Sequence, residues 1–462
     1  MDEFKGRRRE LSVFQRNYEK KGFQMAIVYG RRRIGKTMLI NHFMDLQSCK
    51  TISFTAVERS EAELVSMMSE TVLMSLAPGM AGVTHFDSFD RIFEYIGREA
   101  ANERVIFLID EYPYLAKQCP YVQSLLQKMI DHEWKATNLF FILCGSLVDF
   151  MKEEVLAESA PLHGRSNLEL KLRPFQYWDT GEFLDGYTLE EKAIVYGLTN
   201  GVAKYIRQFD CSKTLDENIA ELFYDIGGYF SEELIKTVVT GERRNPALFN
   251  TVISAIATGH TKYGEIASYA GTEDVNYALK ILMNTEIIER KRTASKQYYA
   301  LRDSMLEFWF QYVNKATSLI HAGNGERYYR SYVREHLHDF MGHIFEKMAG
   351  EYILANAGVE EFPVVTEVEN YQNTIIDESG QKRQIELDVV GKNGKDIVLL
   401  AECKFKNTVF DKEELENYLG KIRYIPSRNA LLCLFSLSGF SDYVKDHAEG
   451  ISLIGIDKMY AR

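Results

Sequence analysis

Along the first part of the chain, short apolar runs alternate with segments whose apolar residues recur at helical spacing. Residues 25–29 (MAIVY), 105–109 (VIFLI) and 139–144 (LFFILC) are unbroken runs of mostly apolar residues. Runs of this length, rich in branched and aromatic side chains, predict buried strands. No apolar run approaches the roughly 18 residues that a membrane helix needs. The pattern predicts an α/β protein that does not enter a membrane.

The segment after the first strand has the pattern of a phosphate-binding loop. It reads GRRRIGKT, which matches GxxxxGK[ST] between an apolar strand and an amphipathic helix. Glycines let successive backbone N–H groups point at phosphate oxygens, at the positive end of a helix dipole. Lys36 adds charge at the β- and γ-phosphates, and the Thr37 hydroxyl is placed to bind Mg²⁺. We therefore expect ATP and Mg²⁺ as cofactors. The predicted loop residues are Gly30, Arg31, Arg32, Arg33, Ile34, Gly35, Lys36 and Thr37.

Polar residues follow two later strands. Asp110 and Glu111 end the run VIFLI, and Ser146 follows LFFILC. Asp110 is predicted to complete the Mg²⁺ shell and Glu111 to polarise the attacking water. Ser146 is predicted to contact the γ-phosphate or that water, although an ordinary turn serine would fit the pattern equally well. The Asp-Glu pair favours hydrolysis over passive binding.

Arg165 follows a glycine in the stretch PLHGRSNLELKLRPF. This position suits an arginine finger that stabilises the transition state, either in its own chain or in a neighbouring one. A surface salt-bridge arginine explains the residue equally well. Both interpretations stay open at the level of sequence.

Composition limits the remaining functions. The chain has 462 residues, with 55 basic and 66 acidic side chains and a net charge of −11. Any nucleic-acid contact must therefore be a local patch. The six cysteines are scattered without a CxxC pair, and the N-terminus lacks the apolar core of a signal peptide. These features predict reduced thiols, no zinc site and a cytoplasmic location.

Several ordered motifs carry a family resemblance over residues 3–210. They are FKGRRREL, YGRRRIGKT, FLIDEYPYL, LCGS and HGR with LRPF. Together they resemble the archaeal-type P-loop ATPases of the AAA-like, STAND-related group. The resemblance implies that Phe4, Gly6 and Arg7 lie near the adenine. That family usually has a Gly-x-Pro turn in its helical lid, and here Ala203 stands in place of the proline.

The middle of the chain has the order of a winged helix-turn-helix. After a charged helical stretch, residues 247–303 predict helix, short helix, turn, longer helix and β-ribbon. Gly271 lies in the turn and residues 275–284 form the potential recognition helix. That helix offers only Asn276, Lys280 and Asn284 to a nucleic acid, so a regulatory arm packed on the ATPase is favoured over DNA contact. The basic residues of the wing are Arg290, Lys291, Arg292 and Lys296.

Two carboxylates lie on apolar strands near the end of the chain. In IELDVVGKNGKDIVLLAECKF, Asp388 is near the end of one strand, and Glu402 and Lys404 share a face of the next. An amphipathic helix at 331–355 contains Glu346. The three carboxylates could ligate a divalent cation, with Lys404 orienting the attacking water. Nearby basic residues, which a solvated face would explain almost as well, are Lys382, Arg383, Lys392, Lys395 and Lys406.

This arrangement resembles the PD-(D/E)xK restriction-endonuclease-like nucleases over about residues 325–462. A domain related to that fold is commonly attached to the archaeal-type ATPases, and its Asp…Glu-Cys-Lys pattern is present here. Leu387 replaces the proline of the motif. The plainer alternative is an α/β sheet with acidic positions and Lys404 paired to one of them.

We expect an α/β chain with an AAA-like P-loop NTPase core (1–180), a helical lid (181–245), a winged helix with a junction helix (246–320) and a restriction-endonuclease-like domain (321–462). The first functional hypothesis is a Mg²⁺-dependent ATPase that controls a metal-dependent nuclease acting on DNA or RNA. The second is a nucleotide-controlled switch or scaffold that binds DNA or a protein partner without cleavage. A small-molecule kinase is disfavoured by the Asp-Glu pair and the large tail. Oligomerisation stays open.

Overall fold

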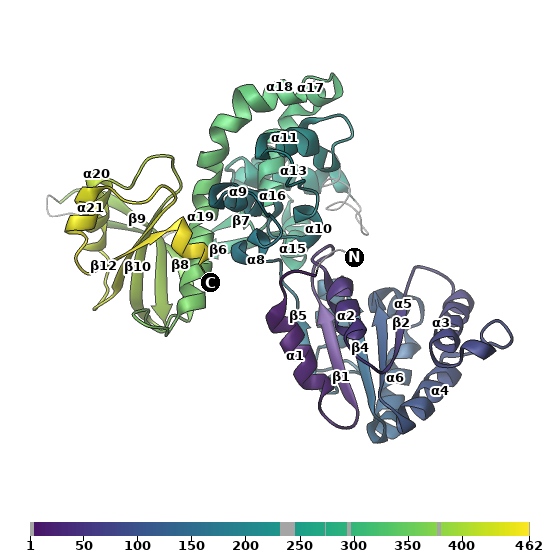
Figure 1. The fold of residues 1–462 in the computed structure, drawn as a ribbon. Helices are drawn as coiled ribbons and strands as arrows, with labels where there is room; N and C mark the ends of the chain where they lie inside the picture. Colours follow the sequence, from purple (N-terminus) through teal and green to yellow (C-terminus); the bar gives the residue numbers. More distant parts are fainter. Residues whose placement is uncertain (1–3, 232–244, 273, 293–296, 377–379, 462) are drawn as a thin grey trace. The chain divides into compact units, whose positions relative to one another are not determined.

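The computed structural model describes residues 4–231, 245–272, 274–292, 297–376 and 380–461. The chain divides into two compact units (Figure 1). The first comprises residues 1–174 together with 202–204, and the second comprises 175–201 together with 205–462. Each unit is described by itself.

The first unit is built on a parallel sheet. Its order is β2-β3-β4-β1-β5, and every neighbouring pair is parallel. The central strands β3 and β4 are buried along their whole length, as their apolar runs predict. Because β3 and β1 flank β4, the loops after these three strands meet at one edge of the sheet. The strands are β1 (Gln24–Tyr29), β2 (Lys50–Thr55), β3 (Val105–Asp110), β4 (Leu139–Gly145) and β5 (Leu168–Lys171).

Helices flank this sheet and complete its core. The longest, α3, begins with a capping box in which Ser60 and Glu63 satisfy each other's backbone N–H groups. Trp134 is fully buried between the helices and the sheet, where its indole N–H donates to the carbonyl of Phe93. The helices are α1 (Arg8–Tyr18), α2 (Lys36–Asp45), α3 (Glu61–Leu76), α4 (Phe89–Asn102), α5 (Tyr112–Gln118), α6 (Tyr121–His132) and α7 (Val148–Phe150), with short turns η1 (Pro78–Met80), η2 (Trp134–Ala136) and η3 (Met151–Val155).

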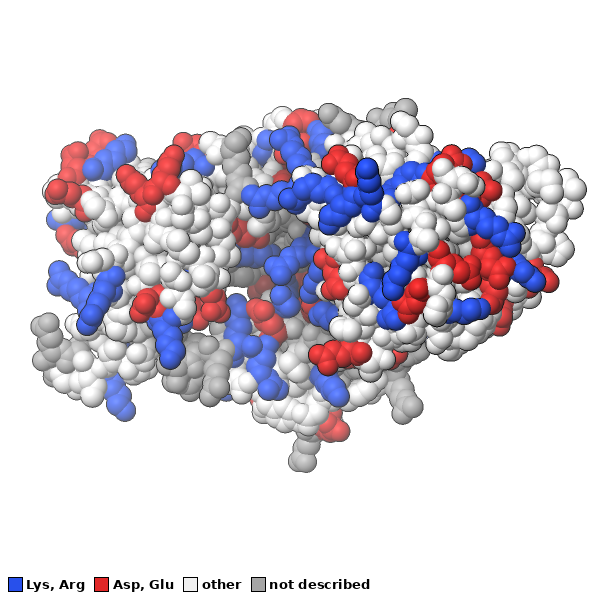
Figure 2. Space-filling model, turned by 90° about the horizontal axis from the view of Figure 1, so that it is seen from below, with Lys and Arg blue, Asp and Glu red and all other residues white. Residues whose placement is uncertain are grey.

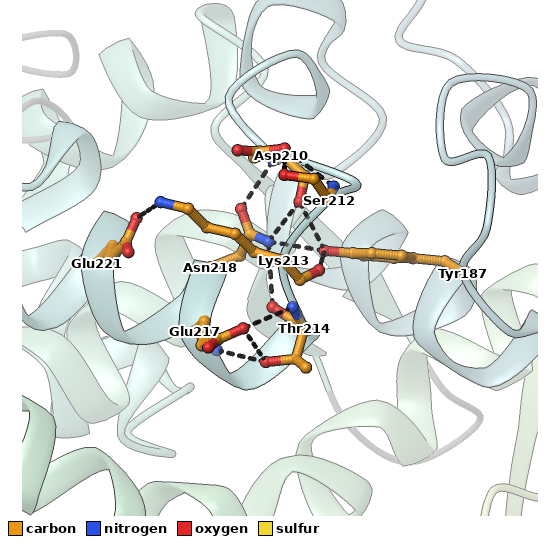
Figure 3. Close-up of polar contacts among 8 residues, drawn as sticks. All are labelled: Tyr187, Asp210, Ser212, Lys213, Thr214, Glu217, Asn218 and Glu221. Carbon is orange, nitrogen blue, oxygen red and sulfur yellow. Dashed lines mark hydrogen bonds and ion pairs between the residues drawn. The ribbon is translucent and has the colours of Figure 1, made fainter.

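The second unit starts with the helices predicted as a lid. A buried side chain, Asn218, organises the loop before α11 (Figure 3). Its amide donates to the Tyr187 hydroxyl at 2.7 Å and to the carbonyls of Asp210 and Thr214, and its Oδ1 accepts from the Asp210 N–H. The buried asparagine thus has partners for its amide and its Oδ1, and it connects both ends of this loop. The elements are α8 (Tyr177–Gly181), α9 (Leu189–Thr199), α10 (Ala203–Ile206), α11 (Leu215–Ile219) and η4 (Ala220–Tyr224). The first two residues of α10 belong to the first unit.

Helices and a β-ribbon then follow in the order predicted for a winged helix. Gly271 ends the second helix in the left-handed conformation, at φ 63°. Lys296, predicted for the wing, lies outside the described residues. The elements are α13 (Pro246–Ala257), α14 (Tyr263–Ala270), α15 (Asn276–Asn284), β6 (Ile288–Arg292) and β7 (Gln297–Leu301).

Aromatic side chains fill the segment that joins the β6–β7 ribbon to the C-terminal sheet. Trp309 is buried and donates its indole N–H to the carbonyl of Phe230. Phe308 packs edge-on against Phe340 of the long helix α19. This burial agrees with a core junction rather than a base-stacking surface. The elements are α16 (Ser304–Phe308), η5 (Trp309–Val313), η6 (Asn314–Ala316), α17 (Thr317–His321), α18 (Gly325–Tyr328), η7 (Tyr329–Val333) and α19 (Arg334–Asn356).

The second unit ends in a mixed sheet of order β12-β11-β10-β9-β8. Strands β8, β9 and β10 are antiparallel, and β10, β11 and β12 are parallel. The elements are β8 (Glu367–Ile376), β9 (Lys382–Asn393), β10 (Asp396–Lys404), α20 (Lys412–Ile422), β11 (Leu431–Ser436), α21 (Asp442–His447), β12 (Ile451–Gly455) and α22 (Ile456–Tyr460).

Charge and apolar length are distributed as the sequence indicates. Lysine and arginine side chains are interspersed with aspartate and glutamate on the face drawn in Figure 2. Within the described residues, no helix is both long and apolar enough to cross a membrane.

Candidate functional site

The predicted phosphate-binding loop connects β1 to α2, which begins at Lys36. Gly35 precedes the helix at φ 91°, a left-handed conformation that glycine adopts without strain. A Cβ atom on Gly30 would lie 2.4 Å from the carbonyl oxygen of Leu172, so a side chain at this position would collide with backbone. Both glycines of the motif therefore meet a steric requirement of the loop.

The ammonium group of Lys36 is held inside the loop. Its Nζ donates to the carbonyl oxygens of Gly30 and Arg31, each at 2.9 Å. The side chain is 5% exposed. Burial lowers the pKa of Lys36, while Cys144, Glu111 and Asp110 act in the opposite direction. The Lys36 ammonium group therefore lies among the loop carbonyls, where an anionic ligand would compensate the cost of its desolvation.

Thr37, in the first turn of α2, and Asp110, the last residue of β3, form a direct contact at the sheet edge. The Thr37 hydroxyl donates to Oδ2 of Asp110 at 2.7 Å. The other oxygen of Asp110 accepts from the Glu111 N–H at 2.9 Å. A hydroxyl and a carboxylate side by side are hard oxygen ligands of the kind that Mg²⁺ prefers. This donor set fits the cation expected from the sequence.

Glu111 and Ser146 meet beside this pair. The Ser146 hydroxyl donates to Oε2 of Glu111 at 2.6 Å, and the Ser146 N–H donates to the same oxygen at 3.3 Å. Glu111 has φ 51°, an uncommon conformation for a residue with a side chain. The structure thus brings Asp110, Glu111 and Ser146 to the loop that carries Lys36, as their positions after β3 and β4 predict.

Some contacts of the loop have no signal in the motif itself. Arg32 donates to the hydroxyl of Tyr114 in α5. Arg7 donates to the carbonyls of Ile34 and Arg173, at 3.1 and 2.7 Å, and so fastens the loop to the chain after β5. In the sequence, only the resemblance to the archaeal-type ATPases, which implies that Arg7 lies near the adenine, points to this residue. Three residues before Arg7, the ring of Phe4 stacks on His42 with centroids 4.0 Å apart.

The backbone around Ala203 lies against the loop within the first unit. The Lys204 N–H donates to the carbonyl of Arg33 at 3.2 Å. A Cβ atom on Gly35 would lie 3.7 Å from the Cβ of Ala203. The segment that lacks the family's proline therefore still contacts the phosphate-binding loop.

Arg165 is not brought to this edge of the sheet. It precedes β5, whose start pairs with the start of β1, whereas the phosphate-binding loop follows the end of β1. Its guanidinium binds both oxygens of Asp131 in α6, at 3.1 and 2.6 Å. Parallel strands place these two positions at opposite ends of the sheet. The prediction of an arginine finger within its own chain is therefore not supported, and the salt-bridge alternative describes what is seen.

A β-bulge positions Asp388 in the C-terminal sheet. Glu369 pairs with Val390 and Tyr371 with Leu387, so residues 388–389 of β9 face Asn370 alone. Asp388 thus lies within β9 rather than near its end. Bulges insert a residue and re-aim its side chain. Oδ2 of Asp388 accepts from the Cys403 N–H of β10 at 2.8 Å.

Asn370 connects this bulge to the long helix α19. Its amide donates to Oε2 of Glu346 and to the carbonyl of Asp388, both at 2.7 Å. The structure therefore brings the predicted Glu346 and Asp388 to one asparagine of β8. Nothing in the sequence pattern singles out Asn370.

The predicted carboxylates also affect one another electrostatically. Burial, with a further contribution from Asp388, raises the pKa of Glu346 and of Glu402 to about 7 each. Burial raises the pKa of Asp388 as well, and the Cys403 N–H opposes this shift. Oε2 of Glu402 is buried without a hydrogen-bond partner. A cation would relieve these costs, yet the described residues contain no group of three or more His, Cys, Asp or Glu placed to hold a metal ion.

Lys404 does not face these carboxylates, which corrects the role expected for it. Its Nζ contacts Oε1 of Glu414 at 2.5 Å and donates to the carbonyl of Val409 at 3.0 Å. The ammonium that binds Glu402 comes instead from Lys421 of α20. Lys404 and Glu402 both contact α20, but each pairs with a different residue of that helix. Lys421 lies 19 residues from Glu402, so no short motif reveals it.

The basic residues near this sheet differ in their contacts. Lys392 pairs with Glu369 of β8, so its charge is balanced locally. The others that the sequence singles out are exposed: Lys382, Arg383, Lys395 and Lys406.

The longer of the two family matches begins in the first unit. Residues 4–209 match the family described as an ATPase domain predominantly from Archaea, and residues 309–417 match a family of archaeal and bacterial proteins of unknown function. An uncharacterized protein of Methanocaldococcus jannaschii is 26% identical over 370 residues, which are 78% of this chain and 79% of that protein. An uncharacterized ATP-binding protein of the same organism is 40% identical over 50 residues, 11% of this chain and 85% of that protein.

Among solved structures, the Walker-type ATPase PABY2304 of Pyrococcus abyssi is similar with a TM-score of 0.50 and 18% identity. The match covers 67% of this chain and 96% of that one. At this identity the similarity concerns the fold, and it agrees with the parallel sheet and the loop geometry described above. The chain therefore carries, at residues 4–209, the ATPase domain found predominantly in Archaea, followed at 309–417 by a domain of the archaeal and bacterial family of unknown function.

Proposed function

We propose that this chain binds ATP and hydrolyses it in a Mg²⁺-dependent reaction. The observation that carries the proposal is the 2.7 Å hydrogen bond between the Thr37 hydroxyl and Oδ2 of Asp110. It joins the first residue after the P-loop lysine to the end of a different strand, at the carboxyl edge of the sheet. Those are the two oxygens that would hold the cation beside the β- and γ-phosphates.

Each neighbouring side chain has a role in this reaction. Lys36 exchanges its bonds to the loop carbonyls for bonds to phosphate oxygens. Glu111 orients the attacking water, and Ser146 holds the Glu111 carboxylate in place through its hydroxyl and N–H. Bound Mg²⁺ would supply neutralisation of the charge on the transferred phosphoryl group.

Two variants test this proposal. Lys36→Ala removes the loop cation and should abolish nucleotide binding, measured by titration with a fluorescent ATP analogue. Glu111→Gln keeps the shape of the side chain and should retain binding, while phosphate release falls by about 10²- to 10⁴-fold. Normal phosphate release from Lys36→Ala would refute the proposal.

The second candidate function belongs to the C-terminal sheet. Divalent-cation-dependent cleavage of DNA or RNA is supported by the contact of Glu346 and Asp388 with Asn370, and by the unpartnered, buried Oε2 of Glu402. In this scheme the carboxylates hold the cation that supplies charge neutralisation at the scissile phosphate. Lys421 replaces Lys404 as the ammonium at the site, because it contacts Glu402. The restriction-endonuclease-like fold itself belongs to this proposal.

A different observation favours a switch or scaffold without cleavage. Lys404, the lysine of the Glu-x-Lys pattern, is committed to Glu414, as the plainer interpretation of the pattern requires. In that case the domain would bind DNA or a protein partner, and nucleotide would control the binding. Incubation of the full chain with plasmid, single-stranded DNA and RNA, with ATP and with Mg²⁺ or Mn²⁺, decides between the two. Cleavage that Glu402→Gln abolishes supports the nuclease, and an uncut panel supports the switch.

Oligomerisation and location follow from the same proposal. Arg165 would act on a neighbouring chain's nucleotide only after leaving Asp131. ATP and nucleic acid are cytoplasmic ligands, in agreement with six free cysteines. Analytical ultracentrifugation with and without ATP tests whether an assembly forms in which Arg165 could act.

A further inference from the structure

The chain passes between its two units more than once. It leaves the first unit after Pro174, returns for residues 202–204, and leaves again after Lys204. Two of these passages are tied together, because the Phe175 N–H donates to the carbonyl of Gly201 at 2.8 Å. The short returning segment is therefore anchored directly before it enters the first unit.

Inside the first unit this returning segment touches the phosphate-binding loop. Lys204 donates its N–H to the carbonyl of Arg33, and Ala203 lies beside Gly35. Arg33 has φ 73° and Gly35 has φ 91°, so the loop uses left-handed conformations at the contacted residues. A shift of 202–204 would therefore act on the backbone that must receive the phosphates.

In the second unit, the residues directly before this segment are Asn200 and Gly201. Asn200 is buried at φ 49°, and its Oδ1 accepts from Nζ of Lys347 at 3.1 Å and from the Ser304 hydroxyl at 3.4 Å. A Cβ atom on Gly201 would lie 2.0 Å from the carbonyl oxygen of Phe175. The Gly201 backbone therefore lies directly against the Phe175 backbone, where a side chain would not fit.

Lys347 connects Asn200 to helix α19. Its Nζ lies 5.1 Å from the ring centre of Tyr196 in α9, and Tyr196 in turn donates to Glu351, one turn further along α19, at 2.7 Å. The residue before Lys347 is Glu346, the helix carboxylate bonded to Asn370. One turn of α19 thus carries both the contact to Asn200 and the contact to the C-terminal carboxylates.

We propose that Lys347 and Asn200 are positioning residues for the nucleotide site, through which helix α19 and the phosphate-binding loop influence each other. The proposal rests on the ATP binding proposed above and names its regulation. Ordering of Arg33 and Gly35 around phosphates fixes 202–204, which fixes Asn200 and the Lys347 bond. By linkage, a change at α19 alters nucleotide affinity to the same extent that nucleotide alters α19.

A double-mutant cycle on the full chain tests this coupling. Lys347→Met keeps the apolar stem and removes the ammonium, and Asn200→Gly keeps the left-handed backbone and removes the amide. Each single variant should weaken binding of a fluorescent ATP analogue by about fivefold. The double variant should weaken binding no further than either single one, because both remove the same contact.

A matched control lies on the same helix. Arg334 of α19 pairs with Asp216 at 2.8 Å, away from Asn200. Arg334→Met should leave nucleotide affinity unchanged. Lys347→Arg keeps a donor, so it should lose at most half as much nucleotide affinity as Lys347→Met. If Arg334→Met weakened nucleotide binding as much as Lys347→Met does, the effect would belong to α19 in general, and the role assigned to Lys347 would be wrong.

Hydrogen exchange supplies an independent readout. Nucleotide should slow exchange of the α19 amides in the unmutated chain and should have no such effect in Lys347→Met. If the unmutated chain fails to bind nucleotide, the proposed function falls. If it binds nucleotide and Lys347→Met binds equally well, only the coupling falls.

Discussion

The ammonium of Lys421 is bonded to the carboxylate of Glu402, although the two residues lie on different elements of the C-terminal domain. Lys404, two residues from Glu402 on the same strand, is bonded to Glu414 instead. These two lysines therefore have different roles. Lys421 balances charge at the carboxylates, and Lys404 connects β10 to α20.

Removal of each lysine should have a distinct result. Lys421→Met should abolish any metal-dependent cleavage by the full chain, because Glu402 loses its counter-charge. Lys404→Met should lower the free energy of unfolding by about 1–3 kcal/mol, because Oε1 of Glu414 loses its ion-pair partner and the Val409 carbonyl loses the Lys404 donor. Urea unfolding and a nuclease assay on both variants check this. A stability loss larger for Lys421→Met than for Lys404→Met would contradict the assignment.

Stability should fall as pH rises through the region near neutrality. Glu346 and Glu402 have pKa values raised to about 7 in the folded chain, so between their ordinary value of 4.5 and about 7 the folded state binds more protons than the unfolded state. The stabilisation is complete below pH 4.5 and is lost as pH approaches and passes 7. Metal-free urea unfolding should give a free energy on the order of 5 kcal/mol lower at pH 8 than at pH 5, with about half of the difference from each carboxylate.

The control for that pH dependence is Glu402→Gln, which cannot ionise. In this variant, the difference in the free energy of unfolding between pH 5 and pH 8 should be about half as large. Added Mg²⁺ should stabilise the unmutated chain more at pH 8 than at pH 5 if these carboxylates bind the cation. An unchanged pH dependence in Glu402→Gln would exclude this residue as the source.

Ser146→Ala should reduce the rate of ATP hydrolysis without weakening nucleotide binding. The variant removes the 2.6 Å hydrogen bond that holds Glu111, so kcat should fall about tenfold while KM stays constant. Steady-state phosphate release measures both quantities. Ser166→Ala is a matched control, because its hydroxyl contacts only the exposed Glu169. A rise in KM alone would assign Ser146 to nucleotide binding instead.

Gly201→Ala should destabilise the chain far more than an alanine at another left-handed glycine. Its Cβ would lie 2.0 Å from the Phe175 carbonyl oxygen, whereas Gly186, at φ 89°, has open space around it. Gly186→Ala should cost about 1–2 kcal/mol from backbone strain alone, and Gly201→Ala at least twice as much. Thermal unfolding of both variants makes the comparison. Equal melting temperatures would show that the passage at Gly201 relaxes easily.

The placement of the candidate ATPase residues follows from the sequence because they are neighbours in the chain or lie at fixed places in the topology. Residues 30–37 form one contiguous loop, and Asp110 and Ser146 follow strands whose ends must meet in a parallel sheet. Arg165 shows the limit of this reasoning. A glycine–arginine pair specifies a loop, but which end of the sheet it occupies depends on the pairing of β5 with β1.

The C-terminal site was harder to predict because side-chain length and an inserted residue decide it. Alternation placed Glu402 and Lys404 on one face, but a lysine can reach several ångströms along that face. The bulge at Asp388 interrupts the period of two, and it has no glycine or proline to mark it. Asn370 and Lys421 were missed because they become neighbours only after the sheet and α20 have packed.

The return of residues 202–204 to the first unit has a practical consequence for dissection of this protein. A chain cut after Pro174 would contain the whole parallel sheet and every residue of the GxxxxGK[ST] motif, yet the carbonyl of Arg33 would lose its donor and Gly35 its neighbour. Such a fragment could fold and still misreport the nucleotide affinity of the intact protein. The ATPase and its tail are therefore interleaved along the sequence, and no single cut separates them cleanly.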